Sequence, residues 1–165
     1  MKSMMLAAII AAVAVCSAQA AAHDHHAGNV AVSGAWSRPT PPGAPTAVGY
    51  LTIANNGAAP DRLVGAETPV AAKLTLHSLS MAGGIMKMRA LPEGLALPPK
   101  TAVRLDPSGY HLMFEGLKRP FKAGDHIPAT LHFEHAGAVR ITFDVGDGAK
   151  TTPSMPMVMG PNGQM

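Results

Sequence analysis

The sequence predicts an all-β domain, built as a sandwich or a barrel. Short segments that alternate apolar and polar residues recur from Asn29 onward, which is typical of strands that bury one face. Glycine, proline and asparagine separate these segments, and these residue types favour turns. No window of the chain shows a sustained helical period. A chain of 165 residues is long enough for one such domain with a sizeable core.

Residues 1–22 are predicted to be a secretory signal peptide. An early lysine precedes an apolar run, and small residues follow it, which is the order of regions in such signals. Two A-x-A sites, 18–20 and 20–22, are candidates for cleavage. The apolar run is short for a membrane anchor, so we expect no stable membrane insertion after cleavage. Cys16 could mark a lipoprotein signal, but Val15 is bulky for the residue before a lipidated cysteine.

Cleavage at either site removes Cys16, the single cysteine of the chain. The mature chain then lacks the thiols needed for a CxxC oxidoreductase, a blue-copper centre or a thiolate zinc site. The net charge is +3 and aromatic residues make up 4% of the chain, so nucleic-acid binding has no support. We identify no serine–histidine–aspartate set and no pair of catalytic carboxylates, and we expect the protein not to be an enzyme.

A histidine-rich leader, 23–28, follows the signal peptide and holds His23, His25 and His26. Either cleavage site places a histidine third in the mature chain. There the amine, two backbone amides and the imidazole can form a square-planar Cu(II) or Ni(II) site. The alternative interpretation is a solvated polar leader that binds metal only incidentally.

The predicted β domain spans 29–147. Trp36 and Phe133 are expected in its core. The strand-like segments cover 29–38, 48–55, 61–67, 72–79, 85–91, 101–106, 110–117, 128–137 and 139–146.

The candidate metal ligands lie on two strand-like segments in the middle of the domain. His77 and Met88 belong to a predicted hairpin, in which opposed residues share a face. His111 and Met113 are two residues apart on one strand, so they also share a face. If those two faces meet, two imidazole nitrogens and two thioether sulfurs converge.

The predicted hairpin pairs 77–81 with 84–89 around a turn centred on Ala82-Gly83. A slip of one residue would move Met88 to the other face. The directly opposed pairs are predicted to be His77 with Met88 and Leu79 with Met86.

Two imidazoles and two thioethers suit Cu(I) better than other ions. Thioether sulfur is a soft donor that does not titrate. Zinc prefers cysteine, histidine and carboxylate, and calcium or magnesium would need oxygen ligands. The alternative is that the methionines fill gaps in a β core and the histidines are satisfied by hydrogen bonds.

The last segment, 148–165, is predicted to be a flexible tail, because proline, glycine and serine replace the strand pattern. It contains Met155, Met157, Met159 and Met165. A thioether-rich tail can capture copper loosely and feed a folded site. The alternative is a disordered tail with accidental methionines.

Several stretches resemble the periplasmic copper chaperones called PCuAC. They are WSRPTPPG, GYLTIANNG, DRLVGAETP, LHSLSMAGGIMKMRAL, GYHLMFEGLKRPFKAGD and LHFEHAG, and the similarity runs from about Trp36 to Val145. The family motif is a histidine, ten residues, a methionine, a longer gap and then His-x-Met. Ten residues separate His77 from Met88, but 22 separate Met88 from His111, one more than in the family pattern.

The resemblance implies a cupredoxin-like Greek-key β-sandwich in the periplasm that binds one Cu(I). The family spacing selects Met88, and it makes Met86 a neighbour of the site rather than a ligand. The implied acceptor is the CuA centre of cytochrome c oxidase, reached directly or through another copper chaperone. The implied ligands are His77, Met88, His111 and Met113.

Three other functions remain as alternatives. The first is copper sequestration without a dedicated acceptor. The second is a copper enzyme or electron carrier, which the missing cysteine ligand disfavours. The third is a structural or adhesive β-sandwich with a coincidental methionine cluster.

Overall fold

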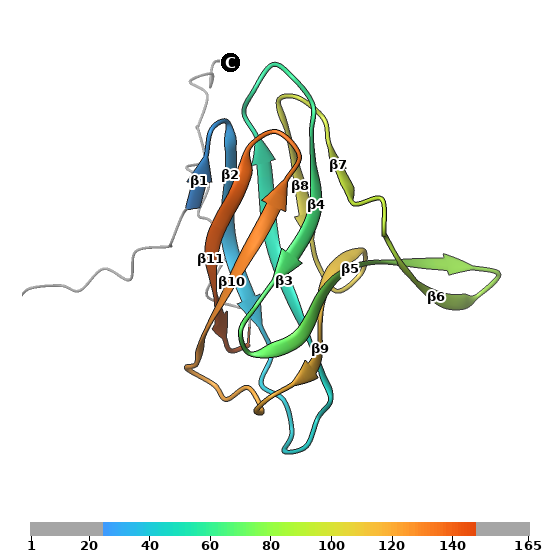
Figure 1. Ribbon diagram of the computed structural model, residues 1–165. Coiled ribbons are helices and arrows are strands. Elements are labelled where there is room, and N and C mark those ends of the chain that lie inside the picture. Colours follow the sequence, from blue (N-terminus) through green and yellow to red (C-terminus); the bar gives the residue numbers. More distant parts are fainter. Residues whose placement is uncertain (1–24, 148–165) are drawn as a thin grey trace, which may run out of the picture.

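The computed structural model describes residues 25–147 and shows an all-β domain (Figure 1). This range contains no helix, and hence none long and apolar enough to cross a membrane. The strands are β1 (His25–Ala27), β2 (Val30–Ser37), β3 (Thr46–Asn55), β4 (Asp61–Glu67), β5 (Ala71–Ala82), β6 (Ile85–Ala90), β7 (Leu95–Leu97), β8 (Thr101–Leu105), β9 (Tyr110–Leu117), β10 (His126–Phe133) and β11 (Gly137–Val145).

Strand pairing runs almost continuously around the core. It passes from β5 through β9, β3, β2, β11 and β10 to β4, and β4 meets β5 again at Ala66 and Leu74. Most neighbours are antiparallel, but β11 pairs with β2 in parallel at Asp144 opposite Trp36. The first long strand and the last strand therefore lie side by side, which ties the two ends of the domain together.

Alternating side chains from the paired strands fill the interior. Phe114 is fully buried, and Phe121 and Phe143 pack edge-to-face against it with ring centroids 5.2 and 5.4 Å apart. Gly49 of β3 lies against the same cluster, where a Cβ would come within 2.7 Å of the Phe143 ring. Phe133 is buried, as predicted.

Two short strands were not expected from the sequence. β7 has three residues, too few to show an alternating pattern. β1 lies in the segment predicted to be the leader, and it pairs with β2 through His25 opposite Val32. Within the described residues, the sheet therefore extends at least four residues before Asn29.

Trp36 is not in the core, contrary to the prediction. It is half-buried and packs on Tyr50, with ring centroids 4.7 Å apart. The register of β2 against β3 shifts between Ser33 and Trp36, and Gly34 has a φ of 61°. This bulge inserts one residue and reverses the inside–outside alternation for the rest of the strand. Val32 and Ala35 therefore point inward, and Trp36 points outward.

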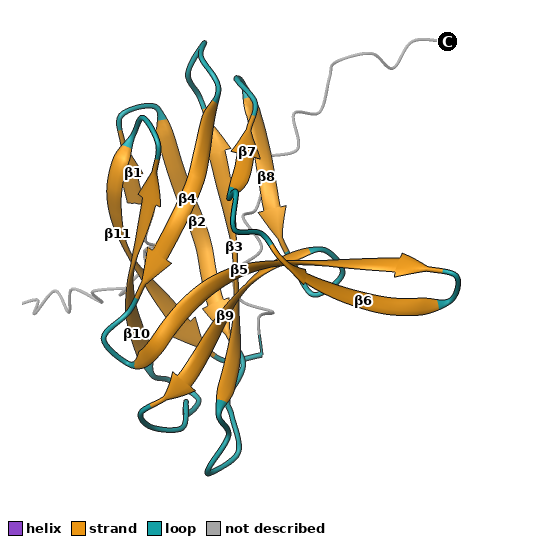
Figure 2. Ribbon diagram, turned by 45° about the vertical axis from the view of Figure 1, so that its right-hand side comes forward, coloured by secondary structure: helices purple, strands orange, loops and turns teal. Residues whose placement is uncertain are grey.

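β5 and β6 form a hairpin that extends away from the sandwich (Figures 1 and 2). We call residues 78–90 the arm. β5 pairs with β9 up to Ser78 and with β6 from His77 onward, so His77 lies where the strand changes partner. Every residue of β6 is exposed. The arm therefore takes little part in the core.

The predicted register of this hairpin is wrong by two residues. The turn is formed by Gly83 and Gly84, with φ of 62° and 75°, as expected of a two-residue loop that needs two left-handed positions. A two-residue shift keeps every side chain on its predicted face. The observed pairs are His77 with Ala90, Leu79 with Met88, and Met81 with Met86.

Candidate metal centre

Two histidines from neighbouring strands form the centre of the site. His77 of β5 and His111 of β9 are directly opposed in the sheet. Their rings stack with centroids 5.7 Å apart and planes inclined by 21°. His111 is 6% exposed, and the His77 side chain is 13% exposed. Two imidazoles are thus held side by side with little access to water.

Hydrogen bonds fix the proton position on His77. The Thr75 hydroxyl donates its single proton to Glu115 Oε1 at 2.5 Å. The same hydroxyl lies 3.0 Å from His77 Nε2, and it has no second proton to donate, so Nε2 must carry hydrogen and donate it. His77 Nδ1 is then left with its lone pair. Nδ1 is buried and has no hydrogen-bond partner among residues 25–147.

Burial lowers the pKa of His111 below its ordinary value, and the nearby His77 acts in the same direction. A hydrogen bond with the backbone of Gly109 partly opposes this effect. His111 is therefore neutral at pH 7, the form in which imidazole binds metals.

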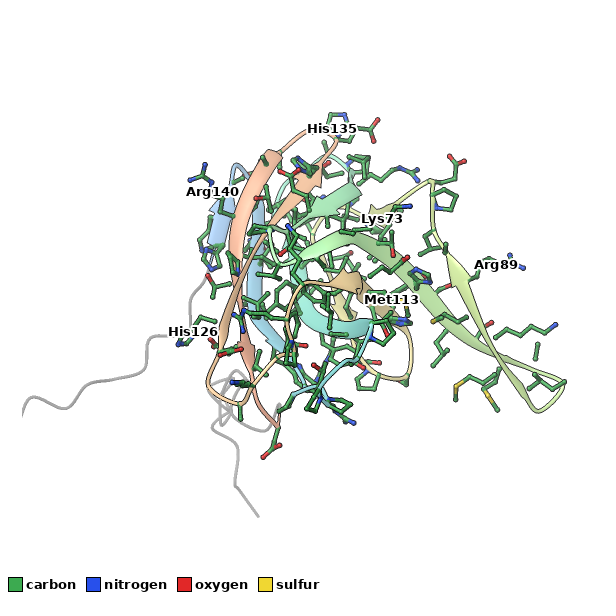
Figure 3. All side chains as sticks on the ribbon, turned by 60° about the horizontal axis from the view of Figure 1, so that its bottom comes forward. Lys73, Arg89, Met113, His126, His135 and Arg140 are labelled. Atoms are coloured by element: carbon green, nitrogen blue, oxygen red, sulfur yellow. The ribbon has the colours of Figure 1, made fainter. Side chains whose placement is uncertain are left out.

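Met113 completes a three-residue cluster on the body of the sandwich. It lies two residues beyond His111 on β9, opposite Thr75 and half-buried. Its position beside the root of the arm is visible in Figure 3. The structure therefore brings His77, His111 and Met113 onto one face, as the sequence predicts.

Met88 and Met86 lie on the arm. Met88 is opposite Leu79, one step outward from His77 on the same face, and it is 52% exposed. Met86 is one step further out and 62% exposed. Neither pairs directly with His77. Diagonal neighbours on a sheet face are about 7–8 Å apart at Cα, within the reach of a long side chain.

The donors present fit a soft monovalent ion. No three side chains among histidine, cysteine, aspartate and glutamate gather into a metal-sized group within the described range. The buried lone pair of His77 and the thioether of Met113 are instead the kinds of donor that Cu(I) accepts. Three other histidines lie on or beside β10, and each is more exposed than His77 and His111 and faces a carboxylate: His126 with Asp144, His132 with Glu67, and His135 with Asp61. His77 also lies near a carboxylate, since its Nε2 is 3.8 Å from Glu115 Oε1, but its Nδ1 faces none. Figure 3 shows His126 and His135 far from Met113.

The predicted auxiliary ligands are only partly within the described residues. His23 and the tail residues Met155, Met157 and Met159 lie outside them. His25 and His26 belong to β1, and the latter is exposed.

Sequence reasoning missed Thr75 and Glu115. Both follow the period of two that pointed to the candidate ligands, because Thr75 is two residues before His77 and Glu115 two residues after Met113. Their side chains therefore share the ligand face. That pattern was available in the sequence, but the hydrogen bonds depend on the pairing of β5 with β9.

Sequence comparisons relate this chain to known proteins. The model of the family described as "Putative lipoprotein LpqE-like" matches residues 30–145. A protein of Leifsonia xyli subsp. xyli (strain CTCB07), named "Putative lipoprotein Lxx21020", is 30% identical over 151 residues, which are 89% of this chain and 90% of the relative.

Several solved structures share the fold of this chain. The copper-bound PCuAC domain from PmoF2 superposes with a TM-score of 0.64 at 25% identity, over 74% of this chain and 97% of that domain. The solution structure of Cu(I)-bound DR1885 from Deinococcus radiodurans gives 0.55 at 32% identity, over 76% and 80%. Its apo form gives 0.57 at 30% identity, over 92% and 100%. These likenesses confirm the cupredoxin-like Greek-key β-sandwich, and the chain belongs to the LpqE-like family, with a folded part of the PCuAC copper-chaperone type.

Proposed function

We propose that this protein is an exported copper chaperone that carries one Cu(I). The observation that carries the proposal is the stacked pair of His77 and His111, with a buried, unpaired Nδ1 and the thioether of Met113 on the same face. Met88 supplies the fourth ligand from the arm. Copper in the PCuAC domain of PmoF2 and Cu(I) in DR1885 support this choice of metal.

The ligand set favours carrying copper over catalysis with it. Two neutral imidazoles and two thioethers leave the +1 charge of Cu(I) uncompensated. An acceptor with thiolate ligands would then be a thermodynamic sink for the metal. We propose the CuA centre of cytochrome c oxidase as that acceptor, reached directly or through another copper chaperone.

The direct test is a Cu(I) titration of the mature protein against a chromophoric competitor. His77→Ala, His111→Ala, Met113→Ala and Met88→Ala should each weaken or abolish one tight equivalent. His126→Ala is the matched control, because this exposed histidine already pairs with Asp144, and its titration should match that of the unchanged protein. Tight binding that survives in all four variants would move the metal elsewhere and overturn the proposal.

Storage of copper without an acceptor is the second candidate, since histidines and methionines occur near both ends of the chain. Mixing the Cu(I)-loaded protein with an apo CuA domain separates the two functions. A chaperone transfers its copper and the CuA absorption bands develop after oxidation, whereas a storage protein retains the metal.

Export to the periplasm fits the N-terminal segment and the lipoprotein names of the family and the relative. Those names also support a second hypothesis for the mature N-terminus, in which Cys16 is lipidated instead of the chain being cleaved within 18–22. Mass spectrometry of the mature N-terminus distinguishes them. A chain beginning at Ala21 or His23 supports the soluble periplasmic form, and a diacylated Cys16 supports an anchored chaperone.

A further inference from the structure

The arm carries three methionines, of which the proposed chaperone site uses only Met88 as a ligand. Met81, Met86 and Met88 are 67%, 62% and 52% exposed. None of them contributes to the buried core. Large apolar side chains exposed together on one small element usually have a function.

The register places these three thioethers on one face of the arm. Met81 is directly opposite Met86, and Met88 follows Met86 by two residues. Opposed residues have Cβ atoms about 4.5–5.5 Å apart, and residues two apart on a strand are separated by about 6–7 Å. Methionine has three rotatable side-chain bonds, so the three sulfur atoms can converge on one point above the hairpin. Figure 3 shows sulfur atoms along this hairpin.

The surroundings select a soft monovalent ion. Residues 78–90 contain no aspartate or glutamate, so the arm itself offers no oxygen anion to a hard cation. Its two charged residues are Lys87 and Arg89, opposite Ser80 and Ser78 on the other face. Three neutral thioethers without carboxylates bind Cu(I), or its mimic Ag(I), in preference to zinc or calcium.

We propose that Met81, Met86 and Met88 form a second, solvent-facing Cu(I) site on the arm. Binding at this site does not depend on His77 or His111. Met88 lies between the two sites, one step from Met86 and one step diagonally from His77. It can exchange between them, so the arm site is the point where copper enters or leaves the histidine pair. This transfer role, unlike the binding, rests on the proposed function.

The test uses the full mature chain with 13C-labelled methionine methyl groups, titrated with Ag(I) and followed by NMR. The starting protein is His77→Ala/His111→Ala, which lacks the chaperone site. The methyl signals of Met81, Met86 and Met88 should shift together over one equivalent. Adding Met81→Leu/Met86→Leu should remove that equivalent and the shift of Met88. Leucine keeps the volume and polarity of the exposed side chain, so folding is preserved.

Two further variants make the result specific. Met155→Leu/Met157→Leu/Met159→Leu is the matched control and should leave the arm shifts unchanged. Replacing residues 81–86 by Asn-Gly joins Ser80 to Lys87 by a two-residue turn, which keeps Met88 opposite Leu79, and it should also remove the arm equivalent. Arm signals that do not move, or that move equally in the Met81→Leu/Met86→Leu protein, would overturn the site.

The same titration separates this inference from the chaperone proposal. Suppose the histidine variants lose the tight equivalent but the arm signals do not shift. The proposed chaperone site is then supported, and the proposed arm site is overturned. If instead the arm signals shift, and the tight equivalent persists when His77 and His111 are replaced, the arm site stands and the chaperone site is removed. If both sites exist, Met81→Leu/Met86→Leu in the otherwise unchanged protein should slow Cu(I) uptake while leaving the tight equivalent in place.

Discussion

At the scale of single residues, the hydroxyl of Thr75 determines which nitrogen of His77 is available. The hydroxyl has one proton, and Glu115 accepts it. It must therefore accept a proton from Nε2, and Nδ1 is left as the donor atom for a metal. In the proposed copper site, Glu115 and Thr75 would affect metal binding without touching the metal.

Thr75→Val should lower Cu(I) affinity by about 10–100-fold, as is typical when a partner of a metal-bound histidine is lost. Thr75→Ser keeps the hydroxyl and should restore most of the affinity. The direct readout is the 15N spectrum of His77 in the metal-free protein, which distinguishes the two tautomers. A histidine that keeps hydrogen on Nε2 alone in Thr75→Val would contradict this role.

At the scale of elements, Asp61 connects the start of β4 to the turn between β10 and β11. Its carboxylate accepts hydrogen bonds from the backbone N–H groups of Arg62, His135 and Ala136 at 2.7 to 2.9 Å. Burial acts to raise the pKa of this carboxyl, but the hydrogen bonds outweigh it and hold the pKa below its usual value. The native state therefore binds this proton less readily than the unfolded chain does.

The hydrogen bonds accepted by Asp61 should affect how stability depends on pH. The stabilisation from Asp61 is present above its unfolded pKa of about 4, and it is lost as the pH falls through the lower folded pKa. Asp61→Asn should reduce the free energy of unfolding by roughly 1–3 kcal/mol at pH 7. The difference from the unchanged protein should shrink in more acidic buffer.

Urea unfolding at pH 7 and pH 3 measures both effects. Asp147→Asn removes an exposed carboxylate and is the matched control, with little change expected at either pH. A deficit in Asp61→Asn that is equally large at both pH values would show that its charge is not what stabilises the turn.

Some features of these elements could be predicted from the sequence and others could not. Alternating apolar and polar residues predicted the long strands and the shared face of the candidate ligands, because a strand that buries one face alternates in side-chain polarity. The pattern did not reveal the bulge at Gly34, and so Trp36 was misplaced. It also could not decide between Ala82-Gly83 and Gly83-Gly84 as the turn, because both keep the same residues on the same face. The contact between His77 and His111 depends on the pairing of β5 with β9, which no local pattern specifies.

At the scale of the whole molecule, the sandwich depends on close packing at a few points where strands approach each other. Gly49 pairs with Ser37 of β2 and with Leu112 of β9, and it lies under the Phe143 and Phe114 rings. An added methyl group would be 2.7 Å from one ring and 3.0 Å from the other. The rings would have to shift within a closely packed aromatic cluster.

Gly49→Ala should therefore lower the free energy of unfolding by about 1–3 kcal/mol. Gly65→Ala is the matched control, because nothing lies within 4 Å of the position its Cβ would occupy. Thermal or urea unfolding measures both. Equal stability of the two variants would show that the core relaxes around Gly49 more easily than its packing indicates.

The exposure of β6 has a consequence for how such proteins can diversify. None of its side chains supports the sandwich, so substitutions on the arm are nearly free of any stability penalty, whereas substitutions at positions such as Gly49 are not. Mutation can thus change what the arm binds or contacts while the domain continues to fold. The same separation makes the arm a natural position for grafting: a different metal-binding or recognition loop could be inserted between Ser80 and Lys87 without redesigning the domain.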